Sequence, residues 1–507
     1  MGRSIDSRSF NRKTMQAISC QVASGSNTVL FDGVTLPARC LLSLRSLCAF
    51  VLLFVFALQC AIPSSALAWG SFTYKDEIEL GKKFNVLVRS RMPIIQDPEV
   101  TEYMTYLINR LTKTMPRQPF EFTPAMVISP SLNAFATPGG YVFAYTGLVL
   151  ALENESDLAG VMAHELAHVT QRHIAGRIEN AQLWNVLSVV GVLAGAFLGG
   201  DAGSATAISA AAASQAAMLN YSRADENDAD QVGMGYLVAA GYNPYAMARA
   251  FAVLSQRQWL LGSSIPTYLS THPNLADRVR ETTTRADRLP EAQRNIKEDN
   301  TRFKRIQALV RARYSDPRPA IVQFNSELSG PNSCLAYMGL GIVAGRQNRV
   351  LDATSFFDKA LECSAKDPLI VREAGRFHYT KGNNARGGSL LQQAVKLDRD
   401  DIMALFFLSR YQADTGQIQD AINNMQVVLR SAPEDAEVHQ FLAKFHGKHN
   451  DLFSANLHMA YSHLYTNNAS RTEQFVKHTK ELASTPEQQT RLARLTRLHD
   501  ERKEFWK

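Results

Sequence analysis

Two histidines four residues apart, with a glutamate beside the first, are the residues of this 507-residue chain best suited to chemistry. His164, Glu165 and His168 lie in the segment VMAHELAHVTQRH, residues 161–173. On an α-helix, residues four apart share a face, so both imidazoles can point at one ion. A zinc ion held by two imidazoles and a carboxylate keeps a position for water and lowers its pKa toward about 7. Glu165 would then accept the proton of that water and pass it to the leaving amine of a peptide.

A third ligand decides between a metal site and a core helix that carries two histidines by chance. The spacing of a third histidine in H-E-x-x-H-x-x-G-x-x-H is not met, so we expect His173 to be a polar residue at the helix end. The acidic segment YSRADENDAD, residues 221–230, offers Glu226 as a ligand. Asp230, four residues on, can accept a hydrogen bond from the free N–H of a ligand imidazole. Without such context, an acidic helix segment is usually a solvated face.

Four motifs, LNAFATPGGYVFAYTGLV, HELAH, SRADENDAD and STHPNLADRV, occur in this order. Over residues 74–285 the chain resembles the zinc metallopeptidase family that includes the CAAX prenyl proteases and the bacterial β-barrel assembly-enhancing proteases. The resemblance implies one Zn²⁺ bound by His164, His168 and Glu226, with Glu165 as the general base and Asp230 beside a ligand.

The same resemblance places His272 and Arg278 near the metal, as candidate catalytic residues. In this family the His-Pro loop approaches the ion. His272 is therefore expected either to stabilise the oxyanion or to take the water position as a fourth ligand that holds the enzyme inactive, and both roles are open at this point.

The elements that must position these residues follow from apolar spacing. Residues 74–115 read as two amphipathic helices, split by Pro93 and by the Asp-Pro pair at 97–98. Residues 121–128 and 141–145 have strand character, with a turn at 138–140. By resemblance, we expect an exposed edge strand that holds extended substrate through its backbone, and its residues are Asn133, Ala134 and Phe135.

Residues 186–215, between the two metal motifs, are rich in alanine and glycine. The apolar part is too short to span a membrane, and its glycines weaken a rigid helix. Two interpretations remain: a buried helix pair that closes the domain, or a mobile lid or membrane-facing plate over the site.

The C-terminal part repeats with a period of 34 residues. Small or apolar residues recur in four series: Gly341, Gly375, Ser409, Ala443; Ala353, Gly387, Ala421, Ala455; Ala360, Ala394, Val428; and Phe357, Leu391, Met425, Met459. This period, with small residues where helices cross, is typical of tetratricopeptide repeats, which bind peptides or partner proteins. An unrelated helical bundle is the alternative.

Within one repeat, Cys334 and Cys363 fall at the start of one helix and the end of the next. We therefore predict a disulfide if the compartment is oxidising; two buried thiols are the alternative.

The N-terminal region predicts export. Arg39 and Arg45 precede the apolar run at 47–58, and the sequence Ala-Leu-Ala ends at Ala68, so we expect a signal peptide cleaved after that residue. An uncleaved membrane anchor is the alternative. Cleavage would lower the net charge from +7 to +3, which gives no argument for nucleic-acid binding.

We therefore expect a mostly α protein, in which an α+β catalytic domain with a small sheet precedes an all-α tetratricopeptide solenoid. The expected boundaries are 1–68 for the signal peptide, 69–290 for the peptidase domain, 291–333 for a helical linker or degenerate repeat, 334–469 for the repeats and 470–507 for a helical cap. The predicted function is a periplasmic zinc endopeptidase, with peripheral membrane contact, that degrades misfolded or stalled envelope proteins. Its repeats would bind clients or the outer-membrane assembly machinery. The alternative is a latent protease that acts as a chaperone or assembly factor; a membrane-embedded prenyl protease is disfavoured because no apolar stretch of about 20 residues follows residue 68.

Overall fold

The computed structural model describes residues 28–31, 34–37, 72–180, 221–260, 268 and 272–503. It divides into two compact units, Met1–Ser71 and Phe72–Lys507. In the first unit, strands β1 (Thr28–Phe31) and β2 (Val34–Pro37) pair antiparallel. The rest of the predicted signal peptide, its cleavage site after Ala68 and the segment 186–215 lie outside the described residues. None of the helices in the described part of the chain is both long and apolar enough to cross a membrane.

Two amphipathic helices open the second unit, as the apolar spacing predicts. Helix α2 (Tyr74–Arg91) begins at a capping box formed by Thr73 and Asp76. Helix α3 (Pro98–Thr112) begins at the Asp97 side chain, which accepts the N–H of Glu99. Pro98 occupies the first turn, where its missing N–H costs no hydrogen bond.

A three-stranded sheet packs one face on α2 and the other face on α3 and the metal-motif helix. Its strands β3 (Thr123–Val127), β4 (Ala134–Thr137) and β5 (Tyr141–Tyr145) follow the order β3-β5-β4, with β3 parallel and β4 antiparallel to β5. Gly139 and Gly140 connect β4 to β5 with φ values of 82° and 88°, which a residue with a side chain rarely adopts. The strand predictions and the turn at 138–140 therefore match the structure.

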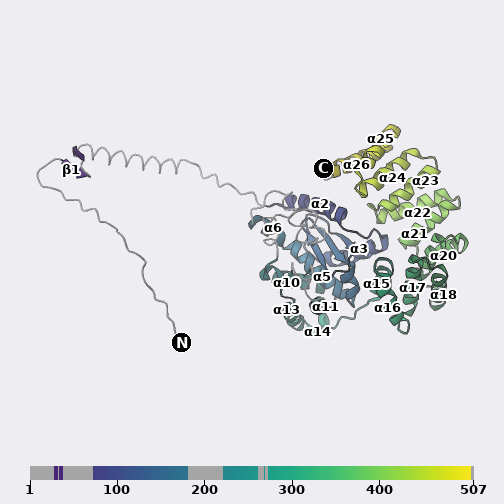
Figure 1. Ribbon diagram of the computed structural model, residues 1–507, viewed down its shortest axis with the longest axis horizontal. Coiled ribbons are helices and arrows are strands. Elements are labelled where there is room, and N and C mark those ends of the chain that lie inside the picture. Colours follow the sequence, from purple (N-terminus) through teal and green to yellow (C-terminus); the bar gives the residue numbers. More distant parts are fainter. Residues whose placement is uncertain are drawn as a thin grey trace, which may run out of the picture. The chain divides into compact units, whose positions relative to one another are not determined.

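The helix that carries His164, α5 (Glu155–Thr170), is buried along nearly its whole length. It packs against β4 and β5, α10 (Arg223–Ala239) and α11 (Ala246–Leu260), while α4 (Thr146–Ala151) precedes it (Figure 1). A Cβ atom on Gly233 of α10 would lie 2.9 Å from the carbonyl oxygen of Ala163, so only glycine permits this close crossing. Helices α6 (His173–Asn180), α13 (Leu275–Asp287) and α14 (Glu291–Arg294) complete this part.

Helix α15 (Thr301–Tyr314) packs against α3 and α4, and α16 (Pro317–Glu327) follows it. Asn300, just before α15, accepts the N–H of Glu155 and donates to the side-chain oxygen of Asn154, both at 2.9 Å. Gln307 donates to the carbonyl oxygens of Val149 and Leu152 at 2.8 and 2.7 Å. Residues after the metal-motif region therefore cap the first turn of α5 and the end of α4.

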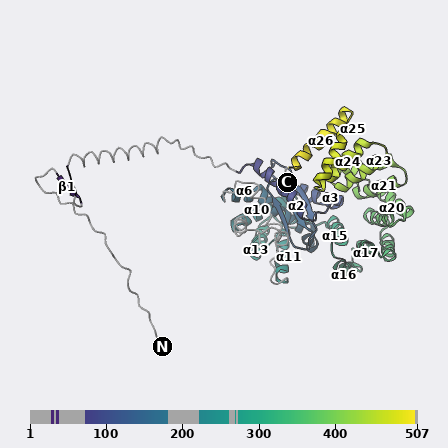
Figure 2. The same ribbon diagram turned by 45° about the horizontal axis from the view of Figure 1, so that its top comes forward.

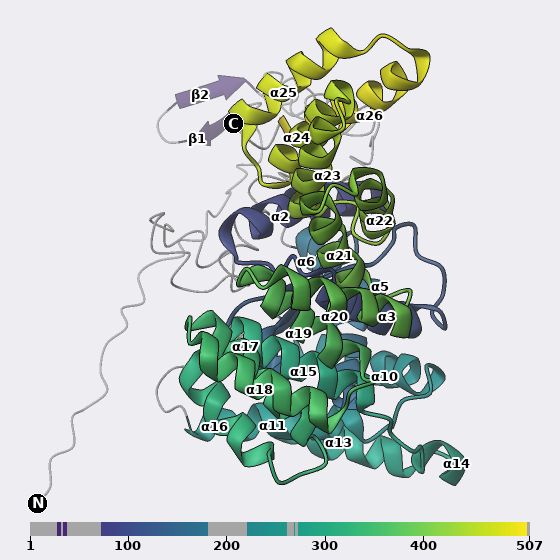
Figure 3. The same ribbon diagram turned by 90° about the vertical axis from the view of Figure 1, so that its right-hand side faces the viewer.

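Antiparallel helix pairs form the C-terminal part, and successive pairs stack on one another (Figures 2 and 3). The helices are α17 (Ser333–Arg346), α18 (Val350–Cys363), α19 (Pro368–Thr380), α20 (Asn384–Leu397), α21 (Ile402–Asp414), α22 (Ile418–Ser431), α23 (Ala436–Lys448), α24 (Leu452–Tyr465), α25 (Ala469–Leu482) and α26 (Pro486–Lys503). The 34-residue period has a local cause, because Asp367, Asp401 and Asp435 each cap the first helix of a pair. A Cβ atom on Gly341 or Gly375 would lie 3.0 Å from atoms of the facing helix. This close approach explains why small residues recur at this position of the repeat. The predicted mostly α fold, with a small sheet and a helical repeat region, is confirmed.

The first pair, α17 and α18, is crosslinked. Cys334 and Cys363 form a disulfide with their Cα atoms 5.5 Å apart. The antiparallel arrangement of the pair brings these two positions together, as the sequence predicts.

Buried ion pairs join the peptidase part to the repeats. Arg313 of α15 pairs with Asp97, which caps α3, and with Glu373 of α19. Arg372 of α19 pairs with Glu99 of α3 at 2.6 Å. Side chains of α3, α15 and α19 therefore share one network.

Candidate metal centre

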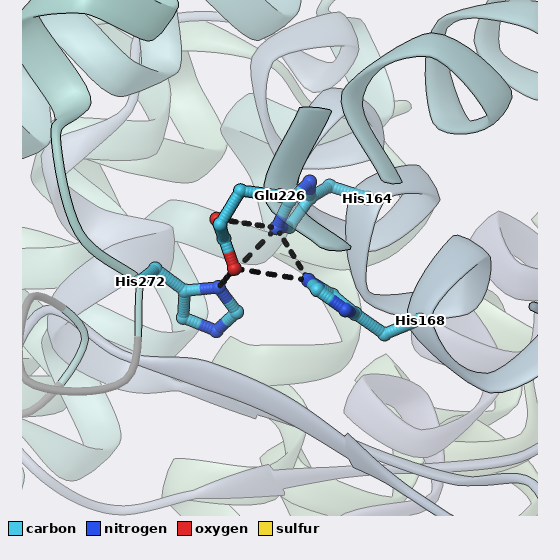
Figure 4. Close-up of side chains that lie close together, drawn as sticks. All are labelled: His164, His168, Glu226 and His272. Carbon is cyan, nitrogen blue, oxygen red and sulfur yellow. Dashed lines mark hydrogen bonds and ion pairs between the residues drawn. The ribbon is translucent and has the colours of Figure 1, made fainter. Parts of the chain in front are cut away.

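Side chains from three parts of the second unit meet at one buried point (Figure 4). Helix α5 supplies His164 and His168, α10 supplies Glu226, and His272 lies just before α13. One donor atom from each of these four residues lies within 4.8 Å of the others. The four side chains are at most 2% exposed, so their polar atoms have little access to solvent.

The individual distances describe a tight group. Nε2 of His164 lies 3.0 Å from Nε2 of His168 and 3.3 Å from Nδ1 of His272. Oε1 of Glu226 lies 2.9 Å from Nδ1 of His272 and 3.4 Å from Nε2 of His168. The structure thus brings together the predicted ligands and adds His272, one of whose two expected roles was a fourth ligand.

Glu165 lies at the edge of the same group. Its Oε1 atom is 3.6 Å from Nε2 of His272, and both atoms are buried with no hydrogen-bond partner among the described residues. The backbone N–H of Ala136 on β4 hydrogen-bonds the Glu165 carboxylate. Glu165 is therefore beside the four donors without being part of the group.

Asp230 and Arg278 orient the ligands from behind. Oδ1 of Asp230 lies 3.0 Å from Nδ1 of His164, which places a proton on Nδ1 and leaves the Nε2 lone pair facing the group. Arg278 donates to both oxygens of Asp230, at 2.8 and 2.6 Å, and also pairs with Glu226. Nη2 of Arg278 also lies 3.2 Å from Nδ1 and Nε2 of His164, so Arg278 contacts a histidine of the group as well as two carboxylates.

Sequence reasoning missed a second orienting contact. His173, expected only as a polar helix end, has Nδ1 2.9 Å from Nδ1 of His168 and Nε2 3.1 Å from Oδ2 of Asp228. Its position five residues after His168 gave no signal on a regular helix. The structure explains the contact, because the chain turns at Arg172, with φ of 57°, before α6 begins.

Two tyrosines were also missed. The ring of Tyr221 stacks on His168 with centroids 3.7 Å apart, and the ring of Tyr268 stacks on His272 with centroids 4.3 Å apart. Both rings are buried. Tyr221 is the first residue of the acidic motif, so the sequence could have indicated that it lies near the site. Tyr268 lies in none of the sequence motifs, so nothing in the sequence indicated its position.

Burial and charge set the protonation of these groups. Burial lowers the pKa of His164 to about 4, so this imidazole is neutral, as a ligand must be. Burial raises the pKa of Glu165 to about 7, which suits a general base. Burial raises the pKa of Glu226, but His272 and Arg278 outweigh it and hold that pKa well below its usual range. Burial opposes protonation of His272, yet Glu226 and Glu165 outweigh it and raise its pKa.

These residues fit a metal ion. Three imidazole nitrogens and a carboxylate oxygen converge, and this donor set suits zinc. Asp230 and His173 hold the outer nitrogens of two of the imidazoles, the arrangement that fixes metal-ligating histidines in proteins. When bound, a zinc ion would supply Lewis-acid chemistry, lowering the pKa of a water and polarising a peptide carbonyl.

The predicted substrate strand is at a sheet edge but is not exposed. Strand β4 pairs only with β5, yet the side chains of Asn133, Ala134 and Phe135 are at most 2% exposed. Phe135 stacks on Phe143 with centroids 4.7 Å apart and belongs to the core under α2. Strand β4 is an edge strand, as expected, but its side chains lie in the hydrophobic core, so it would offer substrate its backbone only.

Comparison with known proteins identifies this part of the chain. The model of peptidase family M48 matches residues 95–286. These residues are a peptidase M48 domain. The M48 domain contains all four donors, Glu165, Asp230 and Arg278, so the resemblance read from the sequence motifs is confirmed.

Relatives of the M48 domain are proteases. A putative β-barrel assembly-enhancing protease of Vibrio cholerae is 36% identical over 227 residues, 44% of this chain and 46% of that protein. The β-barrel assembly-enhancing protease of Escherichia coli K12 is 32% identical over 228 residues, with the same coverage of 44% and 46%. The mitochondrial metalloendopeptidase OMA1 of Schizosaccharomyces pombe is 28% identical over 193 residues, 38% of this chain and 54% of that protein. The chain spans about half the length of the curated relatives it matches.

Solved structures align with about a third of this chain. YrrB, described as a tetratricopeptide protein with an unusual peptide-binding site, aligns with 34% of this chain and 89% of its own at 17% identity and a TM-score of 0.28. MamA of Desulfovibrio magneticus RS-1 aligns with 33% of this chain and 91% of its own at 18% identity and a TM-score of 0.28. The assignment of the repeats rests on their own helix pairs and 34-residue period.

Proposed function

We propose that this chain is a zinc-dependent endopeptidase. The observation that carries the proposal is the convergence of His164, His168, Glu226 and His272, with Glu165 beside them. His164, His168 and Glu226 would hold the ion. The M48 family match and the metalloendopeptidase relatives support the same chemistry.

The chain's own residues would divide the work of peptide hydrolysis. Glu165, with its raised pKa, would take the proton of the attacking water and return it to the leaving amine. The free edge of β4 would hold substrate in extended form by its backbone, because its side chains are buried. Asp230, Arg278 and His173 would keep the ligands in orientation without touching substrate.

His272 gives a second candidate function. Its Nδ1 atom lies among the ligand atoms, which favours a latent form in which this imidazole takes the position that water needs. A protein held in that form would act through its repeats, as a chaperone or assembly factor. If His272 instead swings out of the group, its imidazole would stabilise the oxyanion.

The cellular setting is proposed from the sequence and the relatives. An exported, periplasmic protein would meet misfolded or stalled envelope proteins, and the names of two relatives refer to β-barrel assembly. The repeats would dock such clients or the assembly machinery itself. Sequencing the N-terminus of the protein isolated from its source cells would test export, because cleavage after Ala68 exposes Trp69.

The test of activity is casein cleavage by the purified protein, with zinc content measured for each variant. Glu165→Gln keeps zinc and abolishes cleavage if the proposal holds, whereas Glu153→Gln, the same change at an exposed residue, leaves cleavage intact. His272→Ala cuts faster if His272 is a latch and more slowly if it stabilises the transition state. Zinc binding without cleavage in every variant would favour a chaperone or assembly factor that acts through its repeats, and no zinc in any of them would end the proposal.

A further inference from the structure

A cavity in the described structure lies between α15 and the first two helix pairs, and it shares no residue with the metal centre. Its volume is about 330 Å³, within the range of small-ligand sites. Helices α15, α17, α18 and α19 line it. Its opening is bordered by the exposed side chains of Arg346, Thr380 and Lys381, and its floor includes the buried Arg313 and Glu373.

The lining carries an excess of positive charge. Four cationic side chains face a single carboxylate: the cations are Arg313, Arg346, Arg376 and Lys381, and the carboxylate is Glu373. Lys381 donates to the amide oxygen of Asn348 at 3.0 Å. Arg346 donates to two backbone carbonyl oxygens, at 2.7 and 3.1 Å. Neither rim cation pairs with a carboxylate among the described residues.

The single carboxylate of the cavity is already shared. Glu373 pairs with Arg313, with Arg372 at 3.1 Å and with Arg376 at 3.6 Å. Its burial is outweighed by these arginines, which lower its pKa to about 2, so it is ionised at neutral pH. Asp97 also pairs with Arg313, and Glu99 and Asp401 pair with Arg372, so Arg376 is the one of these three guanidinium groups whose ion pair among the described residues is with Glu373 alone.

Two of the guanidinium groups have unused donors. Nη1 of Arg376 and Nε of Arg313 are buried and have no hydrogen-bond partner among the described residues. The Arg313 side chain is only 5% exposed. Burial and the charge of Arg313 lower the pKa of Arg376, although Glu373 and Asp97 partly offset them. A buried donor without an acceptor is costly, and an incoming anion would remove that cost.

The remaining wall is apolar. Phe357 and Phe377 stack with their ring centroids 5.0 Å apart, and Ile342 and Tyr314 adjoin them. A bare phosphate ion would use the cations but gain nothing from these rings. A carboxylate also matches the planar fork of a guanidinium, which favours two parallel hydrogen bonds.

We propose that this cavity binds a carboxylate of a polypeptide together with an adjacent apolar side chain. The carboxylate would pair with Arg376 and the rim cations, and the apolar side chain would lie on Phe357 and Phe377. The carboxylate has two sources, a chain end or the side chain of an aspartate or glutamate. The site does not depend on the proposed peptidase activity, because binding alone defines it.

Calorimetric titration of the full chain with short peptides tests the site, using Glu165→Gln protein so that cleavage cannot intervene. Three N-acetylated hexapeptides of the same composition elsewhere are compared: one ending in Ala-Phe as the free acid, the same peptide as the amide, and an amide with Asp before the Phe. We expect the neutral amide to bind at least about tenfold more weakly than one of the acids, a difference of about 1.4 kcal/mol. The acid that binds identifies the source, and equal binding of all three overturns the proposal.

The variants separate this cavity from the rest of the repeats. Arg376→Gln should weaken the acidic peptide at least about tenfold. Arg410→Gln is the matched control, because Arg410 occupies the equivalent position 34 residues later, lies 4.4 Å from the ring centroid of Phe441 and does not line the cavity. Equal loss in both variants, or loss in neither, overturns the proposal.

Two further measurements keep the test decisive. Circular dichroism and thermal unfolding establish that each variant is folded, and Lys381→Gln, at the exposed rim, carries the comparison if Arg376→Gln does not fold. Inorganic phosphate is titrated at the same ionic strength. If phosphate binds as tightly as the acidic peptide and with the same dependence on Arg376, the cavity is a general anion site and the peptide proposal falls.

Discussion

Nδ1 of His168 and Nδ1 of His173 lie 2.9 Å apart, on the side of the His168 ring that faces away from the metal centre. The other nitrogen of His173 lies 3.1 Å from the Asp228 carboxylate. A carboxylate behind an imidazole fixes its proton and raises the basicity of the next nitrogen in line. His173 therefore extends the metal centre to a residue outside the H-E-x-x-H motif.

Replacing His173 by Ala should lower zinc affinity about 10-fold to 100-fold, because His168 loses the partner that fixes its tautomer and orientation. Competition with a chromophoric chelator measures the affinity. His449→Ala, at the exposed end of α23, is the control and should leave it unchanged. Unchanged affinity in His173→Ala would mean that the contact does not orient His168.

Replacing Arg278 by Met should destabilise the metal-free protein by about 3–5 kcal/mol, because the buried carboxylates of Asp230 and Glu226 lose their cation. Urea unfolding with a chelator present measures the change. Arg280→Met removes an exposed ion pair with Asp277 on the same helix and should cost less than about 1 kcal/mol. Similar effects of the two changes would show that the buried pairing is not important for stability.

Three buried histidines in the repeats predict a loss of stability in acid. Nδ1 of His439 lies 2.9 Å from Nδ1 of His458, and the rings of His446 and His458 stack with centroids 5.5 Å apart. Burial lowers the pKa of all three, that of His439 to about 4, although Asp451 partly offsets the effect on His446. Because the unfolded pKa is about 6.5, the unfolded chain binds more protons below that value. The contribution of these groups is complete above about pH 6.5 and is lost as the pH falls toward 4.

Unfolding in urea at several pH values tests this expectation. Each imidazole should contribute a slope of up to about 1.4 kcal/mol per pH unit as the pH falls below about 6.5, and for His439 this range extends to about pH 4. His458→Leu should give a shallower slope than the unchanged protein, whereas His449→Leu should keep it. Parallel curves for all three proteins would contradict the assignment.

The disulfide between Cys334 and Cys363 closes a loop with a sequence separation of 29. Changing both cysteines to serine should destabilise the protein by about 2–4 kcal/mol, chiefly because the unfolded chain gains freedom. Thermal unfolding with and without dithiothreitol measures the effect. The reductant should lower the melting temperature of the unchanged protein and leave that of the double variant where it is; alkylation of both thiols without reductant would rule the bond out.

Sequence reasoning reached the residues whose spacing is itself the signal. His164 and His168 repeat at four residues, and Gly341, Gly375 and Ser409 recur at the 34-residue period of the repeats. Such patterns are local, because a helix converts spacing directly into a shared face. The helices, the strands and the helical repeat region were predictable for this reason.

The missed features depend on contacts between distant segments. Tyr268 stacks on His272, and His173 reaches Asp228 only because the chain turns at Arg172. The burial of Phe135 likewise follows from its packing with Phe84 and Phe143, which no alternation within its own strand reveals. Sequence spacing carries no information about such partners, because they come from elements placed by the whole core.

The cap that Asn300 provides to the first turn of α5 has a consequence for how the enzyme can be dissected. The segment that matches the M48 family ends at residue 286, before Asn300 and α15. A fragment cut at that point would leave the start of the metal-bearing helix uncapped and strip the side chain of Gln307 from two carbonyl groups. The segment that matches the M48 family is therefore shorter than the segment that contains every capping contact of α4 and of the metal-motif helix named above.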